Sequence, residues 1–388
     1  MPNFNDYSTS EYGKMIQDRR RTQPFVEALR AAVRPDSVVL DIGAGPGIFS
    51  FLASQFGAAR VYAVESDAAA IEVARRCASN IAGSDRITWI QGLSTELELP
   101  EQVDIVIGDL HGTLPFFKGN IESMIDARKR HLKPGGRMIP LRDVLYAAPA
   151  QAAHEYEHVE APWRRNEYGI DLSAAAPHVV NQWWRASPEP VAAQSLLASP
   201  QVWGEVDYTL TESTDLDKQL EWGIERAGTL HGLYVWFDGN PGEGIGYSNS
   251  PLLPELVYGR AFFPLEQAID VTIGDRLHTR LAVRRVKGDY IYRWDTRITA
   301  ADGSAKAQFR QSTFKAGLTT LVVLRKASAD YLPELTAEGQ IAHAVLQAMA
   351  EGQRLQDIAN AVAMRFPDRF RTPDAALDAV SLLAQKYG

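Results

Sequence analysis

Between Ser37 and Pro140 the sequence alternates short apolar runs with helical segments, and this alternation limits the possible folds more than any other feature. The apolar runs are SVVLDIG, ARVYAVE, RITWIQG, VDIVIGD and GGRMIP. Short apolar runs separated by helices are typical of a parallel sheet with helices on both faces. We therefore predict a Rossmann-like α/β domain over residues 36–140.

The rest of the chain divides into three further segments. Residues 1–35 are polar and then helical, with Pro24 near a helix start. Residues 141–328 contain strand-like segments separated by turns, from DVLYAAPA to TTLVVLRK, which predicts an all-β, barrel-like domain. An irregular insertion at about 173–197 interrupts it. Residues 329–388 predict three short amphipathic helices.

Composition excludes several classes of protein. A net charge of −8 provides no global field that would attract nucleic acid or an anionic membrane. No apolar run approaches the roughly 18 residues that span a bilayer. The first residues, MPNFNDYSTSEYGK, lack the pattern of a signal peptide. The single Cys77 favours a reducing compartment and is expected in the core. We expect a cytoplasmic protein without a metal site.

A glycine-rich turn follows the first apolar run. Asp41 precedes Gly43, Gly45 and Gly47, and these glycines permit a tight turn and a close approach of a ligand to the backbone. Glu65 ends the second apolar run, where a carboxylate can accept hydrogen bonds from both hydroxyls of a ribose. This pattern predicts a cofactor that contains a nucleoside.

A dinucleotide would need its pyrophosphate on the glycine turn. The acidic Asp41 just before the glycines instead makes VVLDIGAGPGIFSFLA and GAARVYAVE resemble the first two motifs of class I S-adenosylmethionine-dependent methyltransferases. The resemblance implies S-adenosylmethionine as cofactor. A dehydrogenase and a ligand-free Rossmann-like domain are the alternatives.

Residues 7 to about 325 resemble the protein arginine methyltransferases. The resemblance rests on MIQDRRRT (15–22), ITWIQGLSTELELPEQVDIVIGD, YGIDLSA, LHGLYVWFD and YSNSP. It implies that Met15 packs on the cofactor, that Arg21 binds the cofactor carboxylate, and that Ser94 and Thr95 lie at the adenine. Taken alone, Arg21 would be read as part of a solvated helix face. The insertion at 173–197 lies where that family carries a dimerisation arm, which implies a head-to-tail homodimer.

The loop that follows the apolar run VDIVIGD, here termed the acceptor loop, departs from that family. Two glutamates of the family clamp the substrate guanidinium, and Asp109 and Lys118 stand in their places. A Thr-His-Trp turn of the family corresponds to Leu256-Val257-Tyr258, so its histidine is also missing. An arginine substrate would face one carboxylate and one ammonium. We therefore predict a peptide or protein side chain other than arginine as acceptor.

Asp109 and His111 are the candidate catalytic residues. Asp109 could orient an acceptor N–H or O–H, and His111 could take its proton near neutral pH. Alternatively, His111 bonds the turn backbone, Asp109 binds cofactor or caps the following segment, and Lys118 is a solvated charge. Two other functions stay open: arginine methylation through a repositioned Glu122, and a catalytically inactive, cofactor-binding partner protein.

The C-terminal segment has a resemblance of its own. LTAEGQIAHAVLQAMAEGQRLQDIANAVAMRF is similar to the helices of PqqD-type peptide-binding domains, although no β-hairpin is apparent ahead of them. That resemblance implies recruitment of a peptide substrate. A winged-helix-like bundle and a packing appendage are the alternatives.

Overall fold

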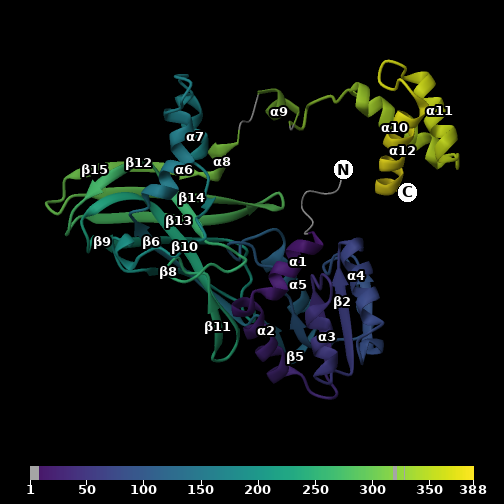
Figure 1. Ribbon diagram of the computed structural model, residues 1–388, viewed down its shortest axis with the longest axis horizontal. Helices are drawn as coiled ribbons and strands as arrows, with labels where there is room; N and C mark the ends of the chain where they lie inside the picture. The colour runs from purple at the N-terminus through teal and green to yellow at the C-terminus, as the bar shows by residue number, and fades with distance from the viewer. Residues whose placement is uncertain (1–7, 318–320, 327) are drawn as a thin grey trace. The chain divides into compact units, whose positions relative to one another are not determined.

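The computed structural model describes residues 8–317, 321–326 and 328–388. It contains two compact units, one within Tyr7–Leu318 and one within Thr319–Gly388 (Figure 1). No helix among the described residues is long and apolar enough to cross a membrane.

Two helices open the first unit: α1 (Thr9–Gln17) and α2 (Arg19–Ala32). Ser8 and Glu11 form a reciprocal capping box that satisfies free backbone donors at the start of α1. Pro24 lies inside α2, so the expectation of a helix start at Pro24 is wrong. Phe25 and Leu29 of α2 are fully buried.

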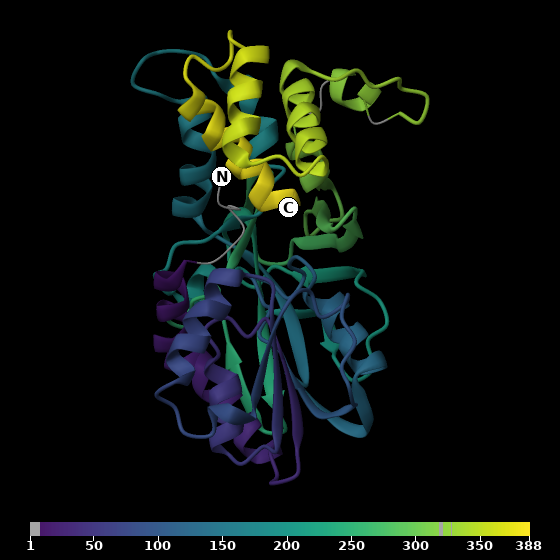
Figure 2. The ribbon, with the colours of Figure 1, turned by 90° about the vertical axis from the view of Figure 1, so that its right-hand side faces the viewer.

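The predicted α/β layer is present, and helices lie on both faces of its sheet (Figure 2). The five parallel strands have the order β3-β2-β1-β4-β5. Their bounds are β1 Val38–Ile42, β2 Arg60–Glu65, β3 Ile87–Gln91, β4 Val103–Ile107 and β5 Leu132–Ile139. The helical elements between them are α3 Ile48–Gln55, α4 Ala68–Ala78, η1 Ser84–Arg86 and α5 Asn120–Arg130. Cys77 of α4 is exposed, which corrects its expected place in the core.

Two antiparallel sheets follow. One has the order β7-β12-β10-β6-β8, with β11 paired to β10, and the other has the order β15-β14-β13-β9. Closure of these sheets into a barrel stays a prediction. Their strands are β6 Arg142–Ala150, β7 Trp184–Arg185, β8 Gln201–Asp207, β9 Leu216–Gly223, β10 Gly228–Gly242, β11 Ile245–Ser248, β12 Ala261–Val271, β13 Arg276–Val286, β14 Asp289–Thr299 and β15 Ala305–Ser312.

The helical interruption of the β region begins earlier than expected. Helix α6 (Ala153–Arg164) directly follows β6, and η2 (Ser173–Ala175), α7 (Ala176–Val179) and η3 (Ala193–Ser195) continue the interruption. Helices α6 and α7 lie side by side (Figure 1), and Val159 packs with Val179 and Val180 in a small core of their own.

A short helix, α8 (Thr313–Ala316), follows β15. The expected strand TTLVVLRK is wrong over its described part, because Leu321–Lys326 forms helix α9. A strand needs a neighbour for its backbone hydrogen bonds, whereas a helix satisfies them within the segment. The three expected C-terminal helices are present as α10 (Ala337–Ala350), α11 (Leu355–Arg365) and α12 (Pro373–Tyr387). They enclose one apolar core around Ile341, Val345, Ile358 and Val380.

Candidate methyltransferase site

The glycine turn after β1 has the conformation that its glycines predict. Gly43, Gly45 and Gly47 have φ values of 68°, 53° and 91°, in the left-handed region that disfavours side chains. A Cβ on Gly45 would come within 2.6 Å of the Tyr12 ring. The backbone is therefore open to close approach only because these positions have no side chain.

Parallel register brings Glu65 to this turn. Ile42 pairs with Val64, so the residues that follow them, Gly43 and Glu65, lie at the same edge of the sheet. The Glu65 carboxylate accepts hydrogen bonds from Gly45 N at 2.8 Å and from Asp67 N at 2.9 Å. Two backbone donors thus fix a carboxylate beside the turn.

Asp41 is enclosed beneath the turn. Ser50 Oγ donates to its Oδ2 at 2.6 Å. Burial raises the pKa of Asp41 to about 7, and the nearby charge of Glu65 adds to the shift, although Ser50 opposes it. Asp41 therefore connects β1 to helix α3 through a carboxylate that titrates near neutral pH.

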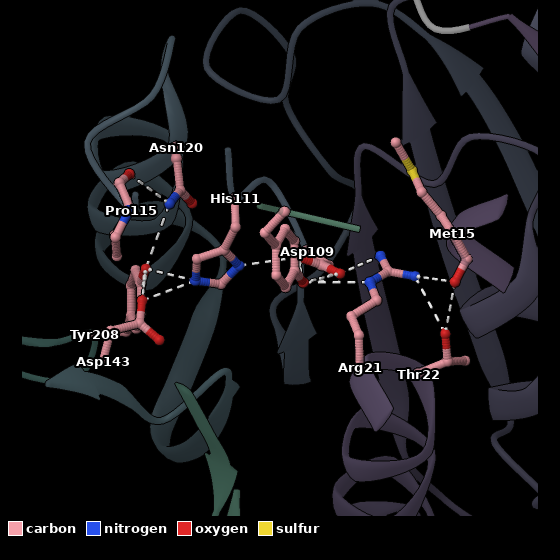
Figure 3. Close-up of polar contacts among 10 residues, drawn as sticks. Met15, Arg21, Thr22, Asp109, His111, Pro115, Asn120, Asp143 and Tyr208 are labelled. Carbon is pink, nitrogen blue, oxygen red and sulfur yellow. Dashed lines mark hydrogen bonds and ion pairs between the residues drawn. The ribbon is translucent and has the colours of Figure 1, made fainter. Parts of the chain in front are cut away.

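The other predicted cofactor residues occupy different environments. The Met15 carbonyl accepts hydrogen bonds from Arg21 Nη1 at 3.2 Å and Thr22 Oγ1 at 2.9 Å, and its side chain points away from them (Figure 3). Ser94 is buried and Thr95 is exposed. Their contacts with a cofactor stay predictions.

The loop between β4 and α5 meets the glycine turn at the same sheet edge. Asp41 pairs with Ile107, which places Asp109 level with Gly43. A Cβ on Gly43 would overlap the Leu110 side chain, with a separation of 2.4 Å. The predicted cofactor turn and the predicted catalytic loop therefore touch each other.

Asp109 lies at the centre of three donors. Arg21 Nη2 forms an ion pair with Asp109 Oδ2, and the Tyr258 hydroxyl lies 2.6 and 2.7 Å from the two Asp109 oxygens. Arg21 Nε also donates to the Tyr258 oxygen at 3.2 Å. Burial acts to raise the pKa of Asp109, but Arg21 and then His111 and Tyr258 lower it below its usual range. Arg21 thus contacts Asp109, and its expected bond to a cofactor carboxylate stays a prediction.

His111 lies between two carboxylates (Figure 3). Its Nδ1 is 2.9 Å from Asp109 Oδ1 and its Nε2 is 2.7 Å from Asp143 Oδ2. Its ring stacks on Phe237 with centroids 5.2 Å apart. Burial acts to lower the pKa of His111, but Asp143 and Asp109 raise it to about 10. His111 is therefore an imidazolium at neutral pH, bonded to side chains and not to the turn backbone.

Three partners of this loop were not predicted from the sequence: Asp143, Tyr208 and Tyr258. The Tyr208 hydroxyl donates to Asp143 Oδ2 at 2.6 Å, and Asn120 Nδ2 lies 3.4 Å from that hydroxyl. The pairing of β6 with β8 brings Asp143 and Tyr208 together from distant parts of the chain. The available signal was Asp143 itself, an ionisable residue in the otherwise apolar run DVLYAAPA.

Lys118 lies near the end of the loop, and Glu122 lies in the first turn of helix α5. Lys118 is exposed and has a positive φ of 45°. Glu122 forms an ion pair with Arg285 of β13, at 2.5 Å, and Arg285 Nη1 also donates to the Lys118 carbonyl. Arg285 therefore ties Glu122 to the antiparallel sheet.

These residues fit S-adenosylmethionine, which supplies a methyl group on a sulfonium. The Glu65 carboxylate suits ribose hydroxyls, and the glycine turn is open where any Cβ would clash. The predicted cofactor residues Asp41, Gly43, Gly45, Gly47 and Glu65 all lie at this one sheet edge.

The parallel sheet, the glycine turn and Glu65 together define a class I methyltransferase domain. Residues 39–136 match the family model described as "Methyltransferase domain". Beyond this domain, the chain resembles protein arginine methyltransferases in sequence over about three fifths of its length, and it resembles them in fold over most of its length.

The chain is 32% identical over 243 residues to a probable protein arginine N-methyltransferase 6 of Arabidopsis thaliana, covering 61% of this chain and 55% of that protein. It is 34% identical over 244 residues to a probable histone-arginine methyltransferase CARM1 of Oryza sativa, covering 58% and 46%. The chain thus spans about half the length of these curated relatives.

Two solved structures share the fold. One is protein arginine methyltransferase 10 of Arabidopsis thaliana, with a TM-score of 0.68 and 22% identity, covering 79% of this chain and 97% of that one. The other is the enzyme–prozyme complex of Trypanosoma brucei PRMT1 with AdoHcy, with a TM-score of 0.68 and 20% identity, covering 78% and 96%.

Proposed function

We propose that the protein is an S-adenosylmethionine-dependent methyltransferase that modifies a peptide or protein side chain other than arginine. The contact between Leu110 of the Asp109 loop and Gly43 of the glycine turn carries this proposal. It joins a nucleoside-binding edge to a buried polar cluster where an acceptor would meet the methyl group.

We assign separate roles to the residues of the site. Glu65 and the glycine turn hold the cofactor, and Asp109 orients the acceptor. Methyl transfer is a displacement in which alignment provides much of the rate. The geometry argues against the expected role of His111 as a base, because both ring nitrogens bond carboxylates and its pKa lies at about 10. His111 instead positions Asp109.

The loop provides no second carboxylate for a guanidinium. Lys118 stands where the resemblance places one, and Glu122 is held by Arg285. A unit charge about 4 Å away contributes roughly 4 kcal/mol at the effective dielectric of a protein surface, so reversing its sign weakens binding by several orders of magnitude.

Incubation with isotopically labelled S-adenosylmethionine and a lysate, followed by mass spectrometry, tests the proposal. We expect labelled peptide at residues other than arginine. Asp109→Asn should lose most of this activity while retaining cofactor binding, and Tyr62→Phe, a change far from the acceptor loop in sequence, is the control. Labelled arginine would contradict the altered acceptor.

Arginine methylation through Glu122 is the first alternative. It requires Glu122 to leave Arg285. Arg285→Ala would then raise arginine methylation, and Lys118→Glu would raise it further by restoring a second carboxylate. If neither variant methylates arginine-rich peptides, this alternative fails.

A catalytically inactive, cofactor-binding partner protein is the second alternative. The enclosed Asp109–His111 pair favours it, because both ring nitrogens of His111 already contact carboxylates without a substrate, although Asp143 Oδ1 has no hydrogen-bond partner. Tight binding of S-adenosylmethionine without transfer to any polypeptide would support it.

We further propose that the protein is cytoplasmic and forms a head-to-tail homodimer through the insertion near 173–197. We also propose that its antiparallel sheets close like a barrel and that residues 329–388 recruit a peptide. The enzyme–prozyme complex of the T. brucei relative is an assembly of that kind of fold. Sedimentation analysis tests the dimer.

Among the described residues from Ser328 onward the chain has helices and no strand, so the hairpin of a PqqD-type domain is absent from that part.

A further inference from the structure

Four buried charges alternate in sign along the acceptor site: Arg21, Asp109, His111 and Asp143 (Figure 3). The side chains of His111 and Asp143 are fully enclosed, and those of Asp109 and Arg21 are 2% and 7% exposed. The row ends on Tyr208, whose hydroxyl donates to Asp143.

His111 is the cation that keeps the two carboxylates together. A neutral imidazole has only one N–H, so bonds from the ring to two ionised carboxylates require its protonated form. Without that ring, two carboxylates would lie close together in an interior that penalises unpaired charge. The Phe237 ring beneath His111 fixes its plane between them.

The row contains two cations and two anions, so its net charge is zero. The sulfonium of the bound cofactor adds one positive charge. A guanidinium or ammonium acceptor would add a second one, with every carboxylate of the row already paired. A carboxylate acceptor would instead return the site to neutrality. It would also need no base, and neither the protonated His111 nor the paired Asp109 can serve as one.

We propose that the acceptor is a carboxylate side chain of a peptide or protein, which the enzyme converts to a methyl ester. This inference rests on the proposed methyltransferase function and names its substrate class. A carboxylate oxygen lone pair forms the new C–O bond to the methyl carbon while the C–S bond breaks. The electron pair of that bond stays on sulfur, which becomes a neutral thioether, and no proton is transferred.

The first test is the alkali lability of the label. Polypeptides labelled from S-adenosylmethionine should release volatile labelled methanol at high pH, as methyl esters do. Alkali-stable label on arginine, lysine or histidine would overturn the inference but leave the methyltransferase function standing. Absence of any transfer would overturn the methyltransferase function itself. Methylguanidinium binding to the His111→Gln variant would then decide whether His111 acts as a cation.

The second test determines whether the His111 ring occupies a position that another cation would take if the ring were removed. His111→Gln should bind methylguanidinium at least about tenfold more tightly than the wild type, measured as a rise in melting temperature against equal sodium chloride. Tyr208→Phe keeps all four charges and should behave as the wild type. If the wild type binds methylguanidinium equally well, or neither protein does, the inference is wrong.

A second variant protects this test against loss of folding in His111→Gln. Asp143→Asn leaves an excess positive charge in the row, so acetate and not methylguanidinium should raise its melting temperature. A rise in the melting temperature of Asp143→Asn with methylguanidinium and not with acetate would also overturn the inference.

Discussion

At the scale of single residues, Asp41 shows how burial changes protonation. Its carboxyl group is fully buried, and its pKa is raised from 3.8 to about 7, mainly by burial. An acid whose pKa is higher in the folded state than in the unfolded state destabilises the fold as pH rises between the two values. The cofactor-free protein therefore loses stability from Asp41 between about pH 4 and pH 7.

Asp41→Asn removes this charge while keeping an oxygen for Ser50. We expect the variant to be more stable than the wild type at pH 8 by roughly 2–4 kcal/mol, with the difference shrinking toward pH 4. Urea unfolding at several pH values measures it. A stability difference that stays constant across that pH range would show that Asp41 does not titrate as described. We also expect the more stable variant to bind the cofactor more weakly.

His111 has the opposite pH dependence. Its pKa is raised from 6.5 to about 10, so its contribution to stability is complete below pH 6.5 and is lost as pH rises toward 10. We expect the wild type to lose stability across this window, and Asp143→Asn to lose less because its imidazolium has one carboxylate fewer. Urea unfolding and the NMR titration of the His111 ring measure this, and a ring that deprotonates near pH 6.5 would contradict it.

The residue scale also shows what the sequence could and could not predict. Asp109 and His111 were recognisable because ionisable residues directly follow an apolar strand. Asp143 stood out as an ionisable residue in an apolar run, but its contact with Tyr208 was not predictable, because that contact depends on the register of β6 against β8 and on which face of each strand is buried. Local sequence contains neither piece of information.

At the scale of elements, one buried side chain connects the acceptor loop to the antiparallel sheet. Asn249 accepts a hydrogen bond from Phe237 N at 2.8 Å and donates to Thr113 O at 3.0 Å and Gly259 O at 2.6 Å. Thr113 belongs to the loop after β4, and Gly259 follows Tyr258. Asn249 thus fixes both segments that surround Asp109.

Asn249→Ala should leave the Phe237 N–H and two carbonyls without partners. We expect a loss of about 2–4 kcal/mol in the free energy of unfolding, and faster amide hydrogen exchange at residues 110–117 and 256–260. Asn166→Ala is a matched control, because Asn166 is half-buried and its side-chain hydrogen bonds go only to Tyr168 and Ile170. Unchanged exchange in both segments would show that Asn249 does not tie them together.

Elements with strong local patterns were predictable, and the others depended on tertiary context. The strand before the glycine turn and the helix over Ala68–Ala78 follow from apolar periodicity alone. Leu321–Lys326 has the composition of a strand but forms a helix, because β propensity acts only where a neighbouring strand is available. Helix α6 was missed because its sequence, AHEYEHVEAPWR, buries only Tyr156 and Val159 and so has a weak pattern.

At the scale of the whole molecule, the apolar cores of the two units share no residue. The large core of the first unit runs from Phe25 to Phe309, and the C-terminal core runs from Ile341 to Val380. Each unit therefore has its own source of stability.

We expect a chain lacking residues 328–388 to keep the fold and the cofactor affinity of the first unit. Calorimetry should show two transitions for the full chain, and the shortened chain should retain one of them within about 2 °C. If the segment recruits peptide, the shortened enzyme should show a higher KM for peptide with kcat unchanged. A single transition that moves on truncation would contradict separate cores.

The Arg21 guanidinium contacts the Asp109 loop and, through the Met15 carbonyl, the first helix of the protein. If the cofactor carboxylate attracts that guanidinium, as the family resemblance implies, Asp109 loses one of its counterions when the cofactor binds. Occupancy of the two substrate sites is then energetically linked, and the linkage is reciprocal: whatever the first ligand does to the affinity for the second, the second must do to the first. The effect of each substrate on the affinity for the other would then depend on the position of one side chain.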